Sequence, residues 1–310
     1  MKYLWTLLLV SLIACSHQPQ INQPALTDEY WEKLIDESHL QKISITEKIK
    51  NDNPKFFSQI QSDTRDPLLL GFWGTSLNSD GGINLNGSLN KQIVDADVSQ
   101  DFHKMFGLKN DNLKVHAGIT HTYGYLFSRL ITPYGFKRKR WITPTLNYAF
   151  DLPELSLSAS TRSGSLLSNL TYFAGKLSFR NKEQLDQLEN LQNVSTEIKA
   201  IDYKLIKKNR VVEKITKPSA LDIVTTLVPL VRKMAGEEND YLLIYTLEDP
   251  KTRHGELITA FPIKLEAYFK IMSPEGMGED KEITLRYNAY KDGFAPARLK
   301  GSRSIDEESI

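Results

Sequence analysis

The sequence has a single cysteine, almost no net charge and no apolar run long enough to cross a membrane. Cys15 is the only cysteine among 310 residues, so no intramolecular disulfide can form and no multi-cysteine metal site is available. Lysine and arginine number 39 against 38 for aspartate and glutamate, a net charge of +1. This balance excludes a global attraction to nucleic acid. The longest apolar segment is shorter than the ~20 residues that span the hydrocarbon of a bilayer.

Familiar catalytic and metal-binding motifs are also missing from the sequence. It contains no His-Glu-x-x-His motif, no Walker loop, no dinucleotide fingerprint and no Gly-x-Ser-x-Gly motif. Asp95, Asp97 and Asp101 lie close together as in a calcium loop. Gln100 and Phe106, however, stand where an EF-hand needs glycine and glutamate. We therefore expect neither a metal nor a cofactor.

The first residues have the layout of a secretory signal. Lys2 supplies a positive charge, and residues 3–14 are apolar apart from Thr6 and Ser11. A charged start, a short apolar segment and a small residue before the cleavage point are typical of signal peptides. We expect residues 1–14 to be removed.

Leu12-Ile13-Ala14-Cys15 resembles the lipobox of bacterial lipoproteins, Leu-x-(Gly or Ala)-Cys. The resemblance implies cleavage by signal peptidase II and attachment of lipid, palmitate included, to Cys15. Ser16, in place of an aspartate, implies sorting to the outer membrane in a host that has one. Two or more acyl chains give stable anchoring, at about 0.8 kcal/mol per buried CH₂ group. The expected location is the bacterial cell envelope, with the protein facing the periplasm or the cell surface.

Behind the anchor we expect a polar tether and then helices. Residues 15–27 are polar with two prolines and no periodicity, as in a linker. Thr27 is a candidate N-cap for the segment that follows, where an apolar helical stripe begins at Trp31. Residues 28–62 are therefore predicted to be a helical lead-in, broken near Pro54.

The body is predicted to be α+β, with mostly antiparallel sheet in two halves and two internal helices. Residues 63–180 contain short β-like runs between Gly, Asn, Ser and Pro, the last of them "LTYFAGKLSF" at 170–179. Residues 181–300 are predicted to form an α+β half. Residues 301–310 are charged and are expected to be a flexible tail.

Several elements of the second half follow from local patterns. Asn181 with Gln184 forms a capping box that begins the first internal helix. Apolar spacing predicts the second helix over 220–236, kinked at Pro229. The remaining segments are predicted to be β-structure: a hairpin over 198–216 that turns near Lys208 and Asn209, a hairpin of 241–249 with 255–263, and strands at 264–272 and 282–290.

Four consecutive cations, Lys137, Arg138, Lys139 and Arg140, are followed by Trp141. In a cytosolic protein this pattern would suggest nucleic acid, but in the envelope the available phosphates belong to lipid or lipopolysaccharide headgroups. At such a membrane surface each nearby cation contributes about 1 kcal/mol of binding free energy, and aromatic rings favour the interface between membrane and water. The segment is a candidate patch for anionic headgroups or ligands. The alternative is an ordinary loop or strand with solvated charges.

His116 and His121 are the nearest pair of histidines. They would point to opposite faces of a strand and about 140° apart on a helix, which disfavours a shared metal. His121, beside Thr120 and Tyr123, could act as a general base, so an envelope hydrolase acting on lipid, glycan or peptide is the alternative function. The sequence favours a lipid-anchored, non-enzymatic binding or assembly module. Its partners would be the membrane and an envelope protein or anionic headgroup, not nucleic acid.

Overall fold

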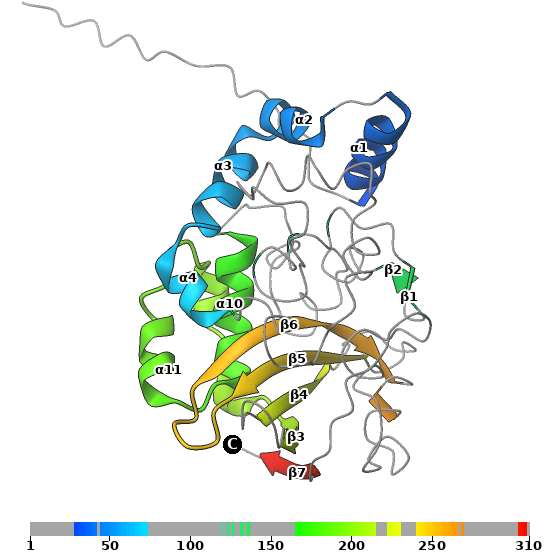
Figure 1. Cartoon of the computed structure of the whole chain (residues 1–310). Helices are drawn as coiled ribbons and strands as arrows, with labels where there is room; N and C mark the ends of the chain where they lie inside the picture. Colours follow the sequence, from blue (N-terminus) through cyan, green and yellow to red (C-terminus); the bar gives the residue numbers. More distant parts are fainter. Residues whose placement is uncertain are drawn as a thin grey trace, which may run out of the picture.

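The fold is α+β, as predicted, with helices packed beside one main antiparallel sheet (Figure 1). In this computed structural model, the residues that the structure describes are 28–41, 44–73, 165–214, 222–230, 240–265 and 303–308, together with Ile119, Tyr123, Leu126, 131–132, 135–136 and 268–269. Short strands β1 (Ile131–Thr132) and β2 (Gly135–Phe136) pair with each other in a separate two-stranded sheet. Thr27, the expected N-cap of the first helix, lies outside the described residues.

Four helices follow one another at the N-terminal side of the described chain. They are α1 (Asp28–Gln41), α2 (Ile45–Asp52), α3 (Pro54–Asp63) and α4 (Pro67–Phe72). The predicted break lies at Asn53, which ends α2 while Pro54 occupies the first turn of α3, where its missing N–H is not needed. Asp66 caps α4 by accepting a hydrogen bond from the Leu68 N–H at 2.8 Å.

Residues 165–178 contradict the strand predicted from "LTYFAGKLSF". They form helix α10 (Leu166–Ser178), which Ser165 caps by accepting from the Ser168 N–H at 2.8 Å. Nearly every residue of α10 is buried. A helix that is covered all round has no polar face, so periodicity cannot distinguish it from a buried strand. The part of 63–180 that the structure describes is thus mainly helical.

The main sheet has five strands in the order β6-β5-β4-β3-β7, all antiparallel to their neighbours. The strands are β3 (Lys208–Lys214), β4 (Asp222–Leu230), β5 (Asp240–Glu248), β6 (Gly255–Lys264) and β7 (Arg303–Glu308). The predicted hairpin of β5 and β6 is confirmed, although only β5 is central. A bulge after Tyr245 shifts the register, and Trp73 forms a parallel bridge to Leu257 on the outer side of β6.

Strand β4 replaces the second predicted helix. The apolar spacing of "ALDIVTTLVPLVRKMAG" fits a helix, but β4 lies between two strands and is buried on both faces, so its apolar residues need not alternate. Its Thr225 and Thr226 are β-branched, which favours a strand. Pro229 does not kink a helix: it pairs with Tyr241 of β5, whereas pairing with β3 ends at Leu227. Pro229 therefore lies beyond the ladder with β3, where its missing N–H removes no bond to that strand.

Three further predictions in this half are corrected. The segment 198–216 is not a hairpin: it contains helix α12 (Thr196–Lys199) at its start, the 3-10 helix η2 (Tyr203–Leu205) and strand β3. The predicted turn at Lys208 and Asn209 is the start of that strand. In 264–272, the described residues after β6 (265 and 268–269) are helical. The tail is not loose at 303–308, because these residues form β7 on the edge of β3. The predicted strand at 282–290 lies outside the described residues.

One hydrophobic cluster joins the described helices to the sheet. It contains Trp31 of α1, Phe56 of α3, Phe173 of α10 and Ile244 of β5, each 2% exposed or less. In Figure 1 the N-terminal helices run along the top and the left of the molecule, and α10 and α11 (Lys182–Leu188) lie at the left end of the sheet. None of the helices described is both long and apolar enough to span a bilayer.

Candidate functional site

The turn between β5 and β6 is stabilised by hydrogen bonds among its own residues. Asp249 accepts from the N–H groups of Lys251 at 2.8 Å and Thr252 at 3.4 Å, and these bonds lower the pKa of its carboxyl, that from Lys251 most. The Arg253 N–H donates to the Asp249 carbonyl at 2.8 Å. Arg253 has a φ of 58°, the left-handed region that glycine adopts most easily. A non-glycine residue keeps this backbone conformation only where the surrounding structure holds it there.

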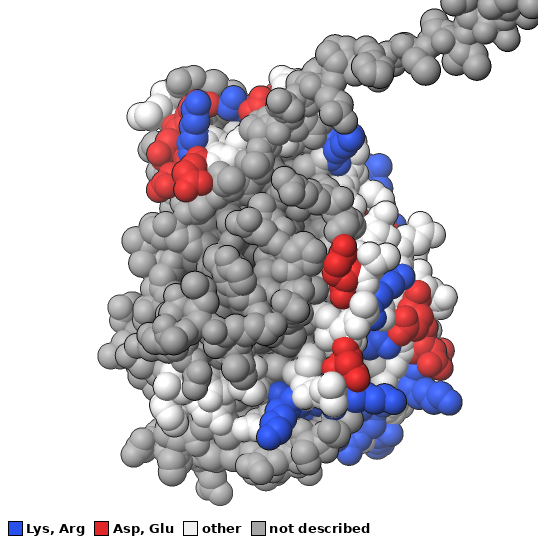
Figure 2. Space-filling model, turned by 180° about the vertical axis from the view of Figure 1, so that it is seen from behind, with Lys and Arg blue, Asp and Glu red and all other residues white. Residues whose placement is uncertain are grey.

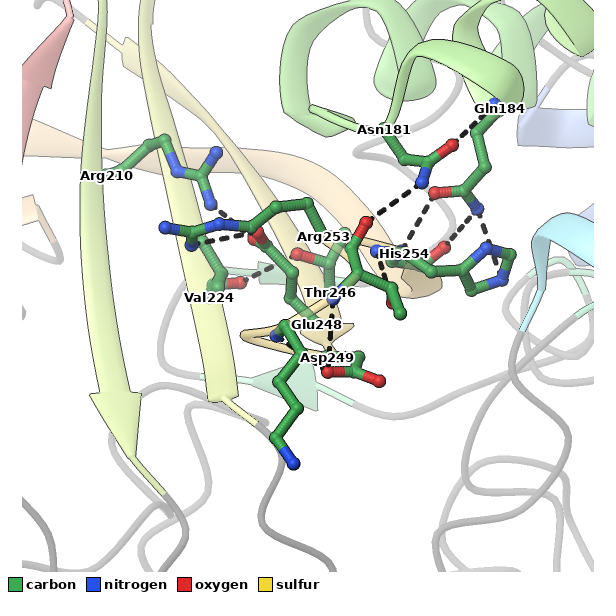
Figure 3. A network of polar contacts seen from close by, with 12 residues as sticks. Asn181, Gln184, Arg210, Val224, Thr246, Glu248, Asp249, Arg253 and His254 are labelled. Carbon is green, nitrogen blue, oxygen red and sulfur yellow. Dashed lines mark hydrogen bonds and ion pairs between the residues drawn. The ribbon is translucent and has the colours of Figure 1, made fainter.

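Two amide side chains, from the N-cap Asn181 and the first turn of α11, bind this turn from one side (Figure 3). Gln184 makes a two-point contact with Gly255: its Nε2 donates to the Gly255 carbonyl at 2.7 Å, and its Oε1 accepts from the Gly255 N–H at 2.9 Å. Asn181 donates to the Thr252 carbonyl at 2.9 Å. Only half of the capping box predicted for Asn181 and Gln184 is present: Asn181 Oδ1 accepts from the Gln184 N–H at 3.1 Å, whereas the Gln184 side chain bonds to Gly255 instead of to the Asn181 N–H. One motif thus begins a helix and anchors the hairpin.

The other side of the hairpin holds a buried ion pair. Glu248 Oε2 lies 2.5 Å from Arg210 Nη2, and the two side chains are 4% and 1% exposed. The second oxygen of Glu248 lies 3.3 Å from Arg253 Nη1. Figure 3 shows Arg210 reaching across from β3 while Arg253 folds back from the turn. The Glu248 carboxylate is thus paired with one buried and one half-exposed guanidinium group, and these charge-assisted contacts link the turn to β3.

Lys208 lies two residues before Arg210 and is also buried. Burial is the main cause that lowers its pKa, to about 8, and the nearby Arg210 and Arg180 act in the same direction. Residues two apart in a strand share a face, so Lys208 and Arg210 place two cations on one face of β3.

A second polar contact lies in the core between the N-terminal helices and α10. The buried Tyr123 hydroxyl donates to Asp63 at the end of α3. Burial raises the pKa of Asp63 from its ordinary value near 3.8 to about 6, against the lowering effect of hydrogen bonds with Tyr123 and Ser165. Burial, followed by the Asp63 charge, holds the pKa of Tyr123 well above its usual range, so its hydroxyl remains a donor. The hydrogen bond between Asp63 and Ser165 joins the end of α3 to the N-cap of α10.

A shallow hollow on α3 is lined by Pro54, Lys55, Ser58, Gln59 and Ser62. Figure 2 shows Lys and Arg side chains gathered toward the lower right of the rear face, with Asp and Glu beside them. Exposed cations between α11 and β6 in the described chain are Lys182, Lys199, Lys204, Lys207, Lys251 and Arg253. Among the described residues both signs are interspersed on this face (Figure 2).

The site residues predicted from sequence lie outside the described residues. This applies to the lipid attachment residue Cys15, to His116 and His121, and to the patch of Lys137, Arg138, Lys139, Arg140 and Trp141. Sequence reasoning missed Glu248, Arg210 and Arg253. No local signal marked them, because Arg210 follows Lys207, Lys208 and Asn209 in a polar run and Glu248 is followed directly by Asp249 at the turn.

In the described part of the chain, no three His, Cys, Asp or Glu side chains gather closely enough to hold a metal ion. Searches for similar proteins found no matching family model, no matching curated protein and no matching solved structure.

Proposed function

We propose that this chain is a lipid-anchored protein of the bacterial cell envelope that works as a binding or assembly module. One observation carries the anchor: Leu12-Ile13-Ala14-Cys15 stands at the end of a short apolar segment that begins after Lys2. Acyl chains on Cys15 would hold the body at the membrane. The polar residues up to 27 would then allow the body to stand off that surface, by about 40 Å when extended at 3.3–3.6 Å per residue.

The roles of the described polar side chains favour binding over catalysis. Glu248 is held by two arginines, and the amide of Gln184 is held by the backbone of Gly255. A buried polar network of this kind makes a turn rigid, and rigid loops on a scaffold are common recognition elements. The competing function, an envelope hydrolase, would require His116 or His121 to lie in a cleft beside an acid.

Substitution of the cysteine tests the anchor. Cys15→Ala should abolish incorporation of radiolabelled palmitate and leave an unprocessed precursor, because signal peptidase II requires the lipid-modified cysteine. The matched control is Ser16→Ala, which leaves the lipobox intact and should be labelled normally. Ser16→Asp should still be labelled but should remain in the inner membrane of a host with two membranes. A Cys15→Ala protein that is still labelled and processed would overturn the proposal.

Vesicle binding tests the partner. A Cys15→Ala chain should bind vesicles containing anionic lipid more tightly than neutral vesicles, and salt should weaken this binding. Reversing Lys137, Arg138, Lys139 and Arg140 to Glu should weaken it by more than tenfold, since each cation near the surface contributes about 1 kcal/mol. The control reverses four exposed cations elsewhere: Lys182, Lys199, Lys204 and Lys207. Equal losses in both variants would show that net charge, and not this segment, determines binding.

A further inference from the structure

Strand β7 is attached to the described structure along one edge only. It is the outermost strand of the sheet, and β3 is the described element beside which it lies along its length. Figure 1 shows it at the lower border of the sheet, beyond β3. The preceding described strand, β6, ends at Lys264, and β7 begins at Arg303, so β7 is not one arm of a tight hairpin with any of the described strands.

The register between β3 and β7 pairs residues of opposite charge. Arg210 lies opposite Asp306, and Lys208 lies opposite Glu308. At the other end, Glu213 lies opposite Arg303. Directly opposite residues in an antiparallel pair share a face, and opposite charges there stabilise the pair whereas like charges destabilise it. Three charged positions of β3, at Lys208, Arg210 and Glu213, are therefore in register with residues of opposite charge.

An apolar pair lies inside this pattern. Val211, which is buried, is opposite Ile305. A slip of one residue would move Ile305 away from Val211 and turn every side chain of the strand to the other face. The combination of one apolar pair with flanking charge pairs specifies a single register.

The inner side of β3 is fixed independently of β7. It pairs with β4 from Asn209 to Lys214, and Arg210 contacts Glu248 of β5 at 2.5 Å. Removal of β7 would thus leave a preformed edge with free backbone N–H and C=O groups. Such an edge is a template for another strand, and many proteins bind extended peptides in this way.

We propose that the outer edge of β3 is a strand-addition site for an acidic segment of a partner protein, and that β7 occupies it as an internal competitor. The partner segment runs antiparallel to β3 and has the order basic, any residue, apolar, acidic, any residue, acidic. These positions lie opposite Glu213, Val212, Val211, Arg210, Asn209 and Lys208. The proposal does not depend on the lipid anchor, and its test needs no membrane.

The test uses a fluorescent peptide with the sequence of residues 301–310 as the probe. It should bind a chain that ends at Lys300 at least about tenfold more tightly than the full chain, because a tethered strand competes at a high effective concentration. The full-length variant Asp306→Lys with Glu308→Lys should bind the peptide nearly as well as the shortened chain. Equal binding to the full and the shortened chain would overturn the proposal, as would a shortened chain that cannot fold.

Backbone methylation distinguishes strand pairing from simple charge attraction. Successive N–H groups of a strand point alternately toward and away from a given neighbour. Of two peptides that are N-methylated at the positions of Ile305 and Asp306, one should lose binding and the other should keep it. Binding of both peptides, or of neither, would contradict pairing along this edge.

A charge exchange tests the register. Glu213→Lys in the shortened chain should weaken the peptide, and a peptide with Glu in place of Arg303 should restore binding to that variant. Lys208→Glu with a peptide that has Lys in place of Glu308 provides a second cycle, with circular dichroism as the check that this buried substitution still folds. Failure of both exchanges to restore binding in folded variants would overturn the assigned register.

Discussion

Among single residues, Glu248 has a large expected effect on stability because its carboxylate lies between two guanidinium groups. Glu248→Ala removes a partner of the buried Arg210, and breaking a buried ion pair by removing one member costs about 3–5 kcal/mol. The double variant Arg210→Met with Glu248→Leu should recover most of this loss, since apolar residues of similar size can replace a buried pair. Urea unfolding at neutral pH measures both changes.

Glu256→Ala is the control for this prediction. Glu256 is exposed near the start of β6, on the same hairpin, so its loss should change stability by no more than about 0.5 kcal/mol. If Glu248→Ala cost no more than Glu256→Ala, the charged network would have no stabilising role in the hairpin.

Asp63 is the residue with the clearest expected pH dependence. Burial raises its pKa to about 6 in the folded protein, above the ordinary 3.8, so the folded state holds this proton more tightly than the unfolded state does. The resulting stability is complete below about pH 4 and is lost as the pH rises through 6, on the order of 3 kcal/mol in all. Asp63→Asn should not show this loss.

Urea unfolding midpoints of wild type and Asp63→Asn are measured between pH 4 and 8. The difference between the two midpoints at each pH reports on Asp63, because the contributions of the other titrating groups cancel. As the pH rises, wild type should lose stability relative to Asp63→Asn. Asp36→Asn, on the exposed side of α1, should instead follow the wild-type curve. Parallel curves for wild type and Asp63→Asn would show that Asp63 has the same pKa in both states.

At the scale of elements, α11 acts on the hairpin through one side chain. Gln184→Ala would leave the buried N–H and C=O of Gly255 without their partner, and each unsatisfied group costs about 1–3 kcal/mol. The loss should be about 2–4 kcal/mol in thermal or urea unfolding. Gln187→Ala is the matched control, because Gln187 is exposed on the same helix and should change stability by less than about 0.5 kcal/mol. Equal losses would show that Gln184 acts only through helix propensity.

The elements that could be predicted from sequence are those with strong local signals. The cap at Asn181 predicted α11, and Pro54 predicted the break between α2 and α3, because capping and proline geometry depend on neighbours in the chain. Helix α10 and strand β4 could not be predicted in this way. Both are buried on all sides, so their type is decided by what packs against them and not by a polar face.

The charged network was missed for a similar reason. Arg210 and Glu248 are far apart in the sequence, and they meet only because β4 lies between their strands. The prediction of β4 as a helix removed the element that aligns them. Strand β7 was missed because its pairing with β3 is non-local and its own sequence is charged, which is typical of an edge strand as well as of a loose tail.

At the scale of the whole molecule, a continuous series of contacts connects the first helix to the sheet. Trp31 packs edge-on against Phe56, with ring centroids 5.7 Å apart, and Phe56 packs in the same way against Tyr123 at 6.4 Å. Tyr123 donates to Asp63, and α10 continues the series by packing beside β5 and β6. A close-packed core transmits strain from one contact to the next. We therefore expect the described helices and the sheet to unfold together.

Trp31→Ala tests this cooperativity. Trp31 is fully buried in α1, and removing such a side chain costs about 3–5 kcal/mol. If folding is all-or-none, hydrogen exchange of β5 amides should accelerate by a factor that matches the loss in global stability, although β5 lies far from Trp31 in the sequence. Glu32→Ala, on the exposed side of the same helix, should leave β5 exchange unchanged. If Trp31→Ala accelerated exchange only in α1 to α3, the N-terminal helices would form a separate unit that is added to an independently stable sheet.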